Sequence, residues 1–290
     1  MKKIFVILAL FLGVVAACSA QDVIKTKARE YRGRIKSADN KSVTIEIPGQ
    51  GTIAVNRSII QDLKIQTPQI VVRGIAAYKK GDYKQAQVDL ASVMTQFPGL
   101  DTAWAAEGID YYGRSCLLAG DLDNAAKAFT IFLESYDAAT HPLARDAEIG
   151  MAEIDLARGN FEKALPKFQE LTAEFDKQVK PPNEQFQDAA ASFLGLAECL
   201  EAQNDPAGAQ DAYLKVVALY PADHTMPETL YRLAALYERQ AKPAETLVYL
   251  NDLAVKFPSS PYAQKAAELK KKVESQLAEK KAETPVAAEK

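Results

Sequence analysis

The stretch "YKKGDYKQA", residues 78–86, interrupts a helix-forming segment with a glycine and an aspartate, then places an alanine five residues after the glycine. Four later stretches repeat this arrangement: "LLAGDLDNAA", "DLARGNFEKA", "LEAQNDPAGA" and "ERQAKPAET". The copies are spaced 39, 39, 45 and 37 residues apart when one column holds Ala86, Ala125, Ala164, Ala209 and Thr246. A period of this length is typical of a solenoid built from repeated helical units.

Each copy has the pattern of a corner between two helices. Five positions before the alanine column stand residues that, except for the last, accept the left-handed conformation of a helix end: Gly81, Gly120, Gly159, Asn204 and Ala241. An N-cap for a second helix follows in four copies: Asp82, Asp121, Asn160 and Asp205. Twelve positions before the column a small residue recurs, beginning with Gly74, which predicts that small residues of the two helices face each other.

The second helix carries an apolar stripe and a stop signal. The stripe, four and seven positions after the column, consists of Leu90, Phe129, Phe168, Tyr213 and Leu250, then Val93, Phe132, Leu171, Val216 and Leu253. An aromatic residue at the eleventh position, followed by proline in three copies, predicts the helix end. After the fifth copy, "SPYAQKAAELKKKVESQLAEKK" predicts a closing helix that covers the last repeat.

These residues resemble the tetratricopeptide repeat (TPR), with its small eighth residue, Gly-Asp-aromatic corner, alanine at position twenty and terminal aromatic and proline. The resemblance covers about residues 70–275 and implies a mainly α fold, a right-handed solenoid of about five helical hairpins with a capping helix. Thr246 departs from the pattern, as does Pro166 inside a second helix. The long repeats are similar to those of bacterial envelope TPR lipoproteins of outer-membrane assembly and cell division.

The segment before the repeats has period two. Residues 30–65 alternate apolar and polar side chains between turns at Asp39-Asn40 and Pro48-Gly51, which predicts a small three-stranded antiparallel β module. A structural or assembly role, including self-association, and a ligand-binding role are both open for it. The predicted organisation is a signal peptide over 1–17, a linker over 18–29, the β module, a solenoid with its capping helix over 66–278, and a disordered tail over 279–290.

The N-terminus indicates export. Lys2 and Lys3 precede an apolar run of 14 residues, Ile4 to Ala17, which is too short for an ordinary membrane span. The run ends in "VAAC", which resembles a bacterial lipobox and predicts lipidation of Cys18; cleavage after Ala20 by ordinary signal peptidase is the alternative. By this resemblance the protein lies on the periplasmic side of the outer membrane, lipid-anchored, or free in the periplasm.

The sequence offers no catalytic constellation. It contains neither a phosphate-binding loop nor a nucleophile motif, and its two histidines and remaining two cysteines lack metal-ligand spacing, so no enzyme activity, metal or cofactor is expected. A net charge of −3 does not favour nucleic-acid binding. The single tryptophan, Trp104, is expected to pack in a first helix or to contribute to peptide recognition.

The function is therefore expected to be the binding of a partner by a surface of the protein. In the TPR family the first helices line a concave groove, mainly through the second, fifth, ninth, twelfth and thirteenth positions of each unit. The polar residues at these positions here are Lys79, Glu107, Asp110, Arg114, Asp146, Glu153, Glu198, Glu201, Glu228, Tyr231, Glu238 and Arg239. With eight acids against three bases, they predict an acidic groove for a basic or polar partner segment, although exposed helix faces are also commonly charged.

The resulting functional expectation is a non-catalytic protein–protein interaction scaffold of the bacterial envelope. An adaptor in outer-membrane protein assembly, or in a related envelope complex, is one reading of the repeats and the lipobox. The alternative is a self-assembling structural scaffold, associated with the cell wall or with division, that recognises no peptide.

Overall fold

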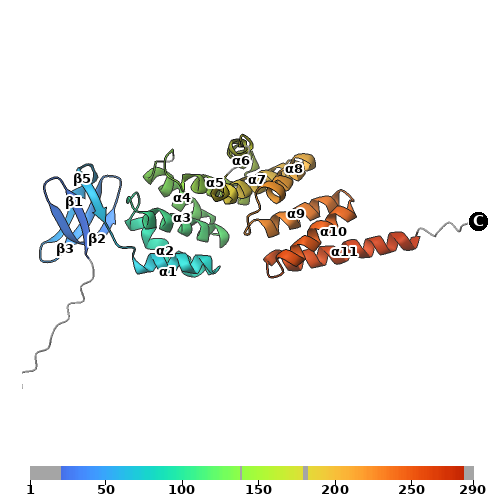
Figure 1. Ribbon diagram of the computed structural model, residues 1–290, viewed down its shortest axis with the longest axis horizontal. Coiled ribbons are helices and arrows are strands. Elements are labelled where there is room, and N and C mark those ends of the chain that lie inside the picture. The colour runs from blue at the N-terminus through green and yellow to red at the C-terminus, as the bar shows by residue number, and fades with distance from the viewer. Residues whose placement is uncertain (1–20, 138, 179–181, 284–290) are drawn as a thin grey trace, which may run out of the picture.

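The computed structural model describes residues 21–137, 139–178 and 182–283. A β module lies at one end of a long row of helical pairs (Figure 1). The predicted signal peptide, Cys18 and residues 284–290 lie outside the described residues. Within the described ranges, every helix is too short or too polar to cross a bilayer.

The β module has five antiparallel strands in the order β4-β3-β2-β1-β5. They are β1 (Asp22–Thr26), β2 (Glu30–Ala38), β3 (Ser42–Ile47), β4 (Gly51–Asn56) and β5 (Ile60–Lys64), with a 3-10 turn, η1 (Arg57–Ile59), before the last. The three predicted strands are present as β2, β3 and β4, and their inward residues Ile35, Val43 and Ile45 are buried. The predicted strand count was wrong: β1 occupies part of the expected linker and pairs with both β2 and β5.

Ten helices form five antiparallel pairs. The first helices are α1 (Gln69–Lys79), α3 (Ala103–Leu118), α5 (Ala144–Ala157), α7 (Phe186–Ala202) and α9 (Met226–Arg239). Their partners are α2 (Tyr83–Gln96), α4 (Leu122–Ser135), α6 (Phe161–Asp176), α8 (Pro206–Leu219) and α10 (Pro243–Lys256). A short 3-10 turn, η2 (Asn183–Gln185), precedes α7, and α11 (Pro261–Glu283) closes the row.

The five corners have one backbone geometry. All five residues predicted to end the first helices have positive φ, including Ala241 at 57°. Asp82, Asp121 and Asp205 each accept a hydrogen bond from the backbone N–H three residues later, at 3.0 to 3.2 Å, which satisfies an amide at the start of the second helix. Asn160 makes no such side-chain bond. The corner prediction is confirmed, and the alanine column is fully buried in every copy.

At the two glycines of the small-residue column, the nearest contacts are not with the alanine column that the sequence predicted. A Cβ placed on Gly74 would meet Leu90, and one on Gly113 would meet Phe129, each one turn beyond the column. The same Phe129 ring also lies against Gly150 of the next pair. Glycine on the first helices thus makes room for large side chains of the second helices, and close packing of this kind joins adjacent repeats.

The β module rests on the first repeats. Asn40, in the β2–β3 turn, donates a hydrogen bond to the backbone carbonyl of Glu134 at 3.3 Å, and its side chain lies close to Gly99. A single apolar core runs from Ile24 in β1 to Ile154 in α5. The β strands therefore share a core with the solenoid.

Three other expectations have structural outcomes. Trp104 is buried and packs edge-on against Phe97 at 5.2 Å, as expected of a core residue. Cys116 and Cys199 are buried free thiols. The helix α11 runs to Glu283, so residues 279–283, predicted to belong to the tail, complete the closing helix.

Candidate functional site

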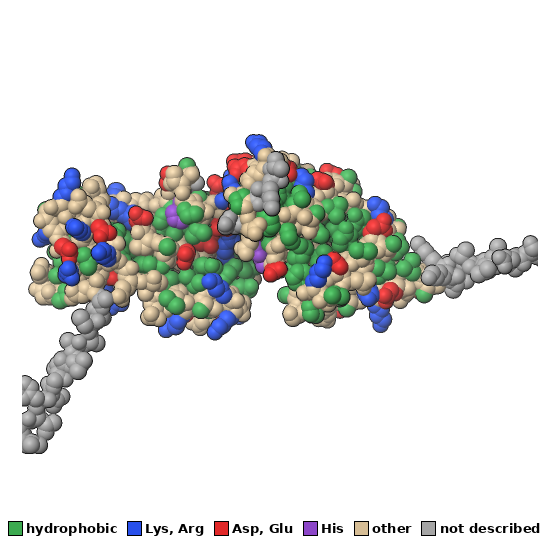
Figure 2. All heavy atoms as spheres, viewed as in Figure 1, with side chains coloured by type: hydrophobic (Ala, Val, Ile, Leu, Met, Phe, Trp, Pro, Cys, Tyr) green, Lys and Arg blue, Asp and Glu red, His purple; other side chains and the backbone are tan. Residues whose placement is uncertain are grey.

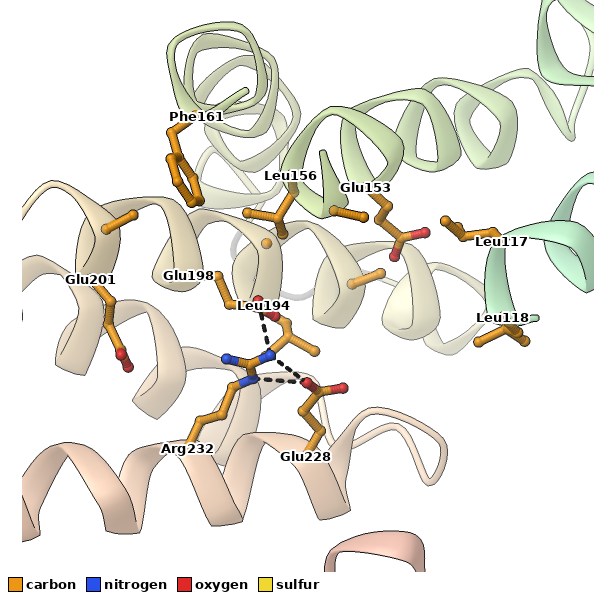
Figure 3. A pocket seen from close by; sticks show the side chains of 14 residues that line it. Leu117, Leu118, Glu153, Leu156, Phe161, Leu194, Glu198, Glu201, Glu228 and Arg232 are labelled. Carbon is orange, nitrogen blue, oxygen red and sulfur yellow. Dashed lines mark hydrogen bonds and ion pairs between the residues drawn. The ribbon is translucent and has the colours of Figure 1, made fainter. Parts of the chain in front are cut away.

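A cavity of about 670 Å³ opens on the concave side of the solenoid. Its wall is formed mainly by the first helices α3, α5, α7 and α9, with Phe161 at the start of α6 (Figure 3). The larger apolar side chains of the wall are Leu117, Leu118, Leu156, Phe161 and Leu194. The charged side chains are Glu153, Glu198, Glu201, Glu228 and Arg232. We call this cavity the concave pocket.

The repeat register explains which residues line the concave pocket. Eleven of its fourteen lining residues occupy the second, fifth, ninth, twelfth or thirteenth position of a repeat unit; Phe161, Gly195 and Arg232 are the exceptions. These positions lie on one side of a helix, because residues three and four apart share a face. The structure brings four predicted residues into the pocket, namely Glu153, Glu198, Glu201 and Glu228.

An ion-pair cluster forms the α7–α9 side of the pocket. Arg232 Nη2 lies 2.9 Å from Glu198 Oε2 and 2.7 Å from Glu228 Oε1, as Figure 3 shows. Burial raises the pKa of Glu198 to about 7, although Arg232 opposes the shift. Arg232 therefore holds two carboxylates of neighbouring repeats together and offsets part of their charge.

Glu153 differs from these carboxylates because it has no ion-pair partner among the described residues. Its side chain projects from α5 toward Leu117 (Figure 3). Burial raises its pKa to about 7, against the attraction of Arg114 and with the repulsion of Glu228, Asp146 and Asp110. A ligand cation beside Glu153 would favour its charged form.

A second ion cluster lies next to the pocket, around Arg114. Its Nε lies 3.1 Å from Asp110 Oδ2, and its Nη2 lies 2.5 Å from Asp146 Oδ1 on the next first helix. Burial raises the pKa of Asp188 of α7 to about 7, and the nearby charge of Asp146 adds to this shift. The cluster links α3 and α5 and engages three of the predicted groove residues, Asp110, Arg114 and Asp146, in internal contacts.

The remaining predicted groove residues lie outside the concave pocket. Arg239 pairs with Glu201 at 2.6 Å, and Glu238 pairs with Lys272 of α11 at 2.8 Å. Tyr231 packs against Tyr262, also of α11, at 5.7 Å. Lys79 and Glu107 lie on α1 and α3, away from the pocket lining.

Sequence reasoning missed the apolar wall and Arg232. Leu117, Leu118, Leu156 and Leu194 occupy the groove positions already named, and restricting the set to polar residues removed them. Arg232 stands at the sixth position of its unit, but its placement four residues after Glu228 signals a helical ion pair. Including Arg232 and Lys272 lowers the negative charge that the groove presents to a partner.

Two family models, both described as Tetratricopeptide repeat, match the chain over residues 113–179 and 149–224, and over 228–260. The matched residues together amount to half of the chain. The chain belongs to the tetratricopeptide repeat family. The first pair, α1 and α2, lies outside the matched ranges, yet it has the same corner geometry as the TPR units that follow.

Solved structures agree on this fold. A thermophilic TPR protein from Thermus thermophilus, TTC0263, is 16% identical with a TM-score of 0.52, over 69% of this chain and 96% of that one. The apo form of RapI is 13% identical with a TM-score of 0.53, over 74% of this chain and 84% of that one. No curated protein matches the chain. At these identities the likeness supports the TPR fold alone.

The described residues contain no group of three or more His, Cys, Asp and Glu side chains placed to hold a metal ion. The concave pocket offers groups suited to recognition: an apolar wall, a set of carboxylates, and one carboxylate, Glu153, that has no cation partner in the part of the chain that the structure describes. TPR folds commonly serve as protein–protein interaction scaffolds through this face.

Proposed function

We propose that the protein is a non-catalytic interaction scaffold of the bacterial envelope whose concave pocket binds a segment of a partner protein. The proposal rests on the concave pocket itself, which is built mainly by one set of repeat positions on four successive first helices. Its volume accommodates a few side chains of an extended or helical segment, and its apolar wall gives them area to bury.

The pocket's composition defines the partner segment. An apolar side chain would contact Leu117, Leu156 and Leu194, and a lysine or arginine beside it would reach Glu153. Paired acids such as Glu198 and Glu228 contribute less, because Arg232 already neutralises part of their charge. Such a contact would set selectivity and association rate more than affinity, and it would weaken as salt rises.

A photo-crosslinking comparison tests the pocket. Leu118 in the pocket and Val248 on α10 have nearly equal exposure, 54% and 57%, so a photo-reactive residue at either position is equally accessible. We expect position 118 to crosslink a partner in the native envelope and position 248 to give none. Equal crosslinking at both positions would contradict recognition by the pocket.

The proposed location is the periplasmic side of the outer membrane, with a lipid on Cys18. The supporting observation is the run "VVAAC" after a short apolar segment. Cys18→Ser should abolish metabolic labelling by fatty acid, with Cys116→Ser as the control that keeps it. Unchanged labelling of the Cys18 variant would contradict lipidation at Cys18 and place the lipid on another residue.

The proposed role is that of an adaptor in outer-membrane protein assembly, on the strength of the repeat style and the lipobox. Crosslinking in native membranes followed by mass spectrometry tests it. Co-recovery of β-barrel assembly components would support the adaptor, whereas recovery of copies of the same chain alone would favour a self-assembling scaffold.

A further inference from the structure

Charge is distributed very unevenly between the β module and the TPR solenoid. Residues 21–67 contain nine lysines and arginines against five aspartates and glutamates, a net charge of +4. Residues 68–290 contain 24 against 33, a net charge of −9. The mildly acidic total therefore combines a basic end with an acidic body, and Figure 2 shows Lys and Arg side chains spread over the β module.

The strand register places many of these cations on one outward face. On that face Val23 of β1 lies between Arg32 of β2 and Lys64 of β5. Lys25 and Arg34 are the neighbouring outward residues along β1 and β2, and Lys27 and Arg29 extend the face into the β1–β2 loop; all six cations are exposed. The acids on this surface are Glu30, Asp62 and Glu46; Glu46 lies opposite Arg34 and pairs with Lys36 at 3.3 Å. We call this surface the basic face.

The basic face is only partly neutralised by its own acids. Arg32 pairs with Glu30 at 2.6 Å, and Arg29 stacks over the ring of Tyr31 at 4.2 Å. In residues 21–137, 139–178 and 182–283, no carboxylate lies within ion-pair distance of Lys25, Lys27, Arg34 or Lys64. These cations are free to meet an anionic surface, unlike many of the groove acids, which are held by arginines.

We propose that the basic face docks on the anionic phospholipid headgroups of the membrane, as a second attachment beside the lipid anchor. The inference rests on the anchor proposed above: only three residues separate Cys18 from Asp22, the first residue of β1. Four peptide steps span at most about 14 Å, so a lipid on Cys18 holds the module against the headgroups. This upper limit is less than two Debye lengths at physiological salt, about 8 Å each, so basic residues on the module can gain from an anionic surface.

The charge of the rest of the molecule favours a membrane over a second copy as the partner. The solenoid, at −9, is repelled by an anionic surface and is expected to extend away from it, which leaves the concave pocket open to partners. Docking of the basic face into another chain's groove would require acids that Arg114, Arg232 and Arg239 already engage. The lipid surface presents unpaired phosphates in excess.

Vesicle co-sedimentation of the mature full-length chain carrying Cys18→Ser tests the inference without the anchor. We expect binding to vesicles of phosphatidylcholine mixed with phosphatidylglycerol, none to phosphatidylcholine alone, and a decline as salt rises. Arg34→Glu with Lys64→Glu should lower the partition coefficient about tenfold or more. Lys84→Glu with Lys127→Glu makes the same charge change at exposed solenoid lysines and should have little effect.

A gain-of-charge variant removes the ambiguity of a misfolded double mutant. Asp62→Lys adds a cation to the basic face and should strengthen binding to the anionic vesicles several-fold. Equal binding to both vesicle types, or equal effects of the two double variants, would overturn the inference. So would a salt-sensitive self-association abolished by Arg34→Glu with Lys64→Glu. Fatty-acid labelling of the wild-type chain reports separately on the anchor, so its loss and the loss of docking are distinguishable.

Discussion

At the residue scale, the packing of the solenoid depends on single large side chains held between glycines. Phe129 of α4 is fully buried and lies against Gly113 within its own pair and against Gly150 in the next. A Cβ at Gly150 would overlap the ring, and a fully buried ring in a close-packed interior moves little. These contacts make one ring part of two repeat interfaces.

Gly150→Ala should therefore destabilise the protein, although alanine favours helix by about 1 kcal/mol. Overpacking costs about 1 to 3 kcal/mol, and we expect a net loss seen as a lower urea midpoint. Phe129→Leu should relieve the overlap, so the double variant should lose less than the sum of the single losses. Strict additivity would show that Phe129 does not contact Gly150.

A second residue-scale property is the dependence of stability on pH. Glu153 has its pKa raised from 4.5 to about 7 by burial, so the folded chain holds a proton there that the unfolded chain releases. Where the folded state binds more protons, stability falls as pH rises, here between about 4.5 and 7. Glu198 and Asp188 act in the same direction.

Glu153→Gln should remove part of this dependence. We expect the variant to match the wild type at low pH and to exceed its stability above neutral pH by about 1 to 3 kcal/mol, as measured by urea unfolding. Glu134→Gln, at an exposed helical position, is the control and should leave the pH profile unchanged. Burial lowers the pKa of His141 and His224, which acts in the opposite direction in the wild type and the variant alike. A variant profile parallel to that of the wild type would therefore contradict the assignment.

At the element scale, the five corners share a geometry but differ in how well their residues suit it. Gly81, Gly120 and Gly159 adopt positive φ without a side-chain penalty, whereas Ala241 does so at a cost of about 1 kcal/mol. Lys242, the N-cap of α10, also makes no side-chain capping bond. The α9–α10 corner is the least suited of the five.

Ala241→Gly should stabilise the protein by about 0.5 to 1 kcal/mol, after the extra unfolded-state entropy of glycine is deducted. The matched reverse change, Gly120→Ala, places alanine in the same geometry at the α3–α4 corner and should lower the melting temperature. Calorimetry of both variants measures the change in melting temperature that each substitution causes. Shifts of the same sign would contradict the common corner geometry.

The corners between helices could be predicted from the sequence, whereas two of the strands could not. The corners were predictable because each is local: a residue that ends a helix and an N-cap lie next to each other in the chain. The strands β1 and β5 were not, because "DVIKT" and "IQDLK" are short and lack a clear period of two. They pair with each other across more than thirty residues, as Val23 with Lys64, and only the closed sheet stabilises them.

At the scale of the whole molecule, the shared core predicts that the β module and the first repeats unfold together. Ile45 in β3 and Trp104 in α3 belong to the same buried core. Ile45→Ala should cost about 2 to 5 kcal/mol and move the Trp104 fluorescence transition to lower urea. Trp104 is the chain's one tryptophan, so its signal reports this region.

Leu253→Ala supplies the comparison, because Leu253 lies in a separate core with Met226 and Leu230 at the other end of the solenoid. In a repeat protein each unit contacts its neighbours, so this change should affect the Trp104 transition less. If Ile45→Ala leaves the Trp104 midpoint in place, the β module folds independently of the repeats.

The sequence by itself determined the repeat number, the corners and the buried columns, because each follows from neighbouring residues and from a period that recurs five times. It also supplied the positions from which the concave pocket is built. Only the tertiary structure decided which carboxylates are paired, since Arg232 holds Glu198 from another repeat while Glu153 has no such partner among the described residues. Ion pairing and sheet closure depend on distances between segments that are remote in the chain, and these distances are defined only in the folded structure.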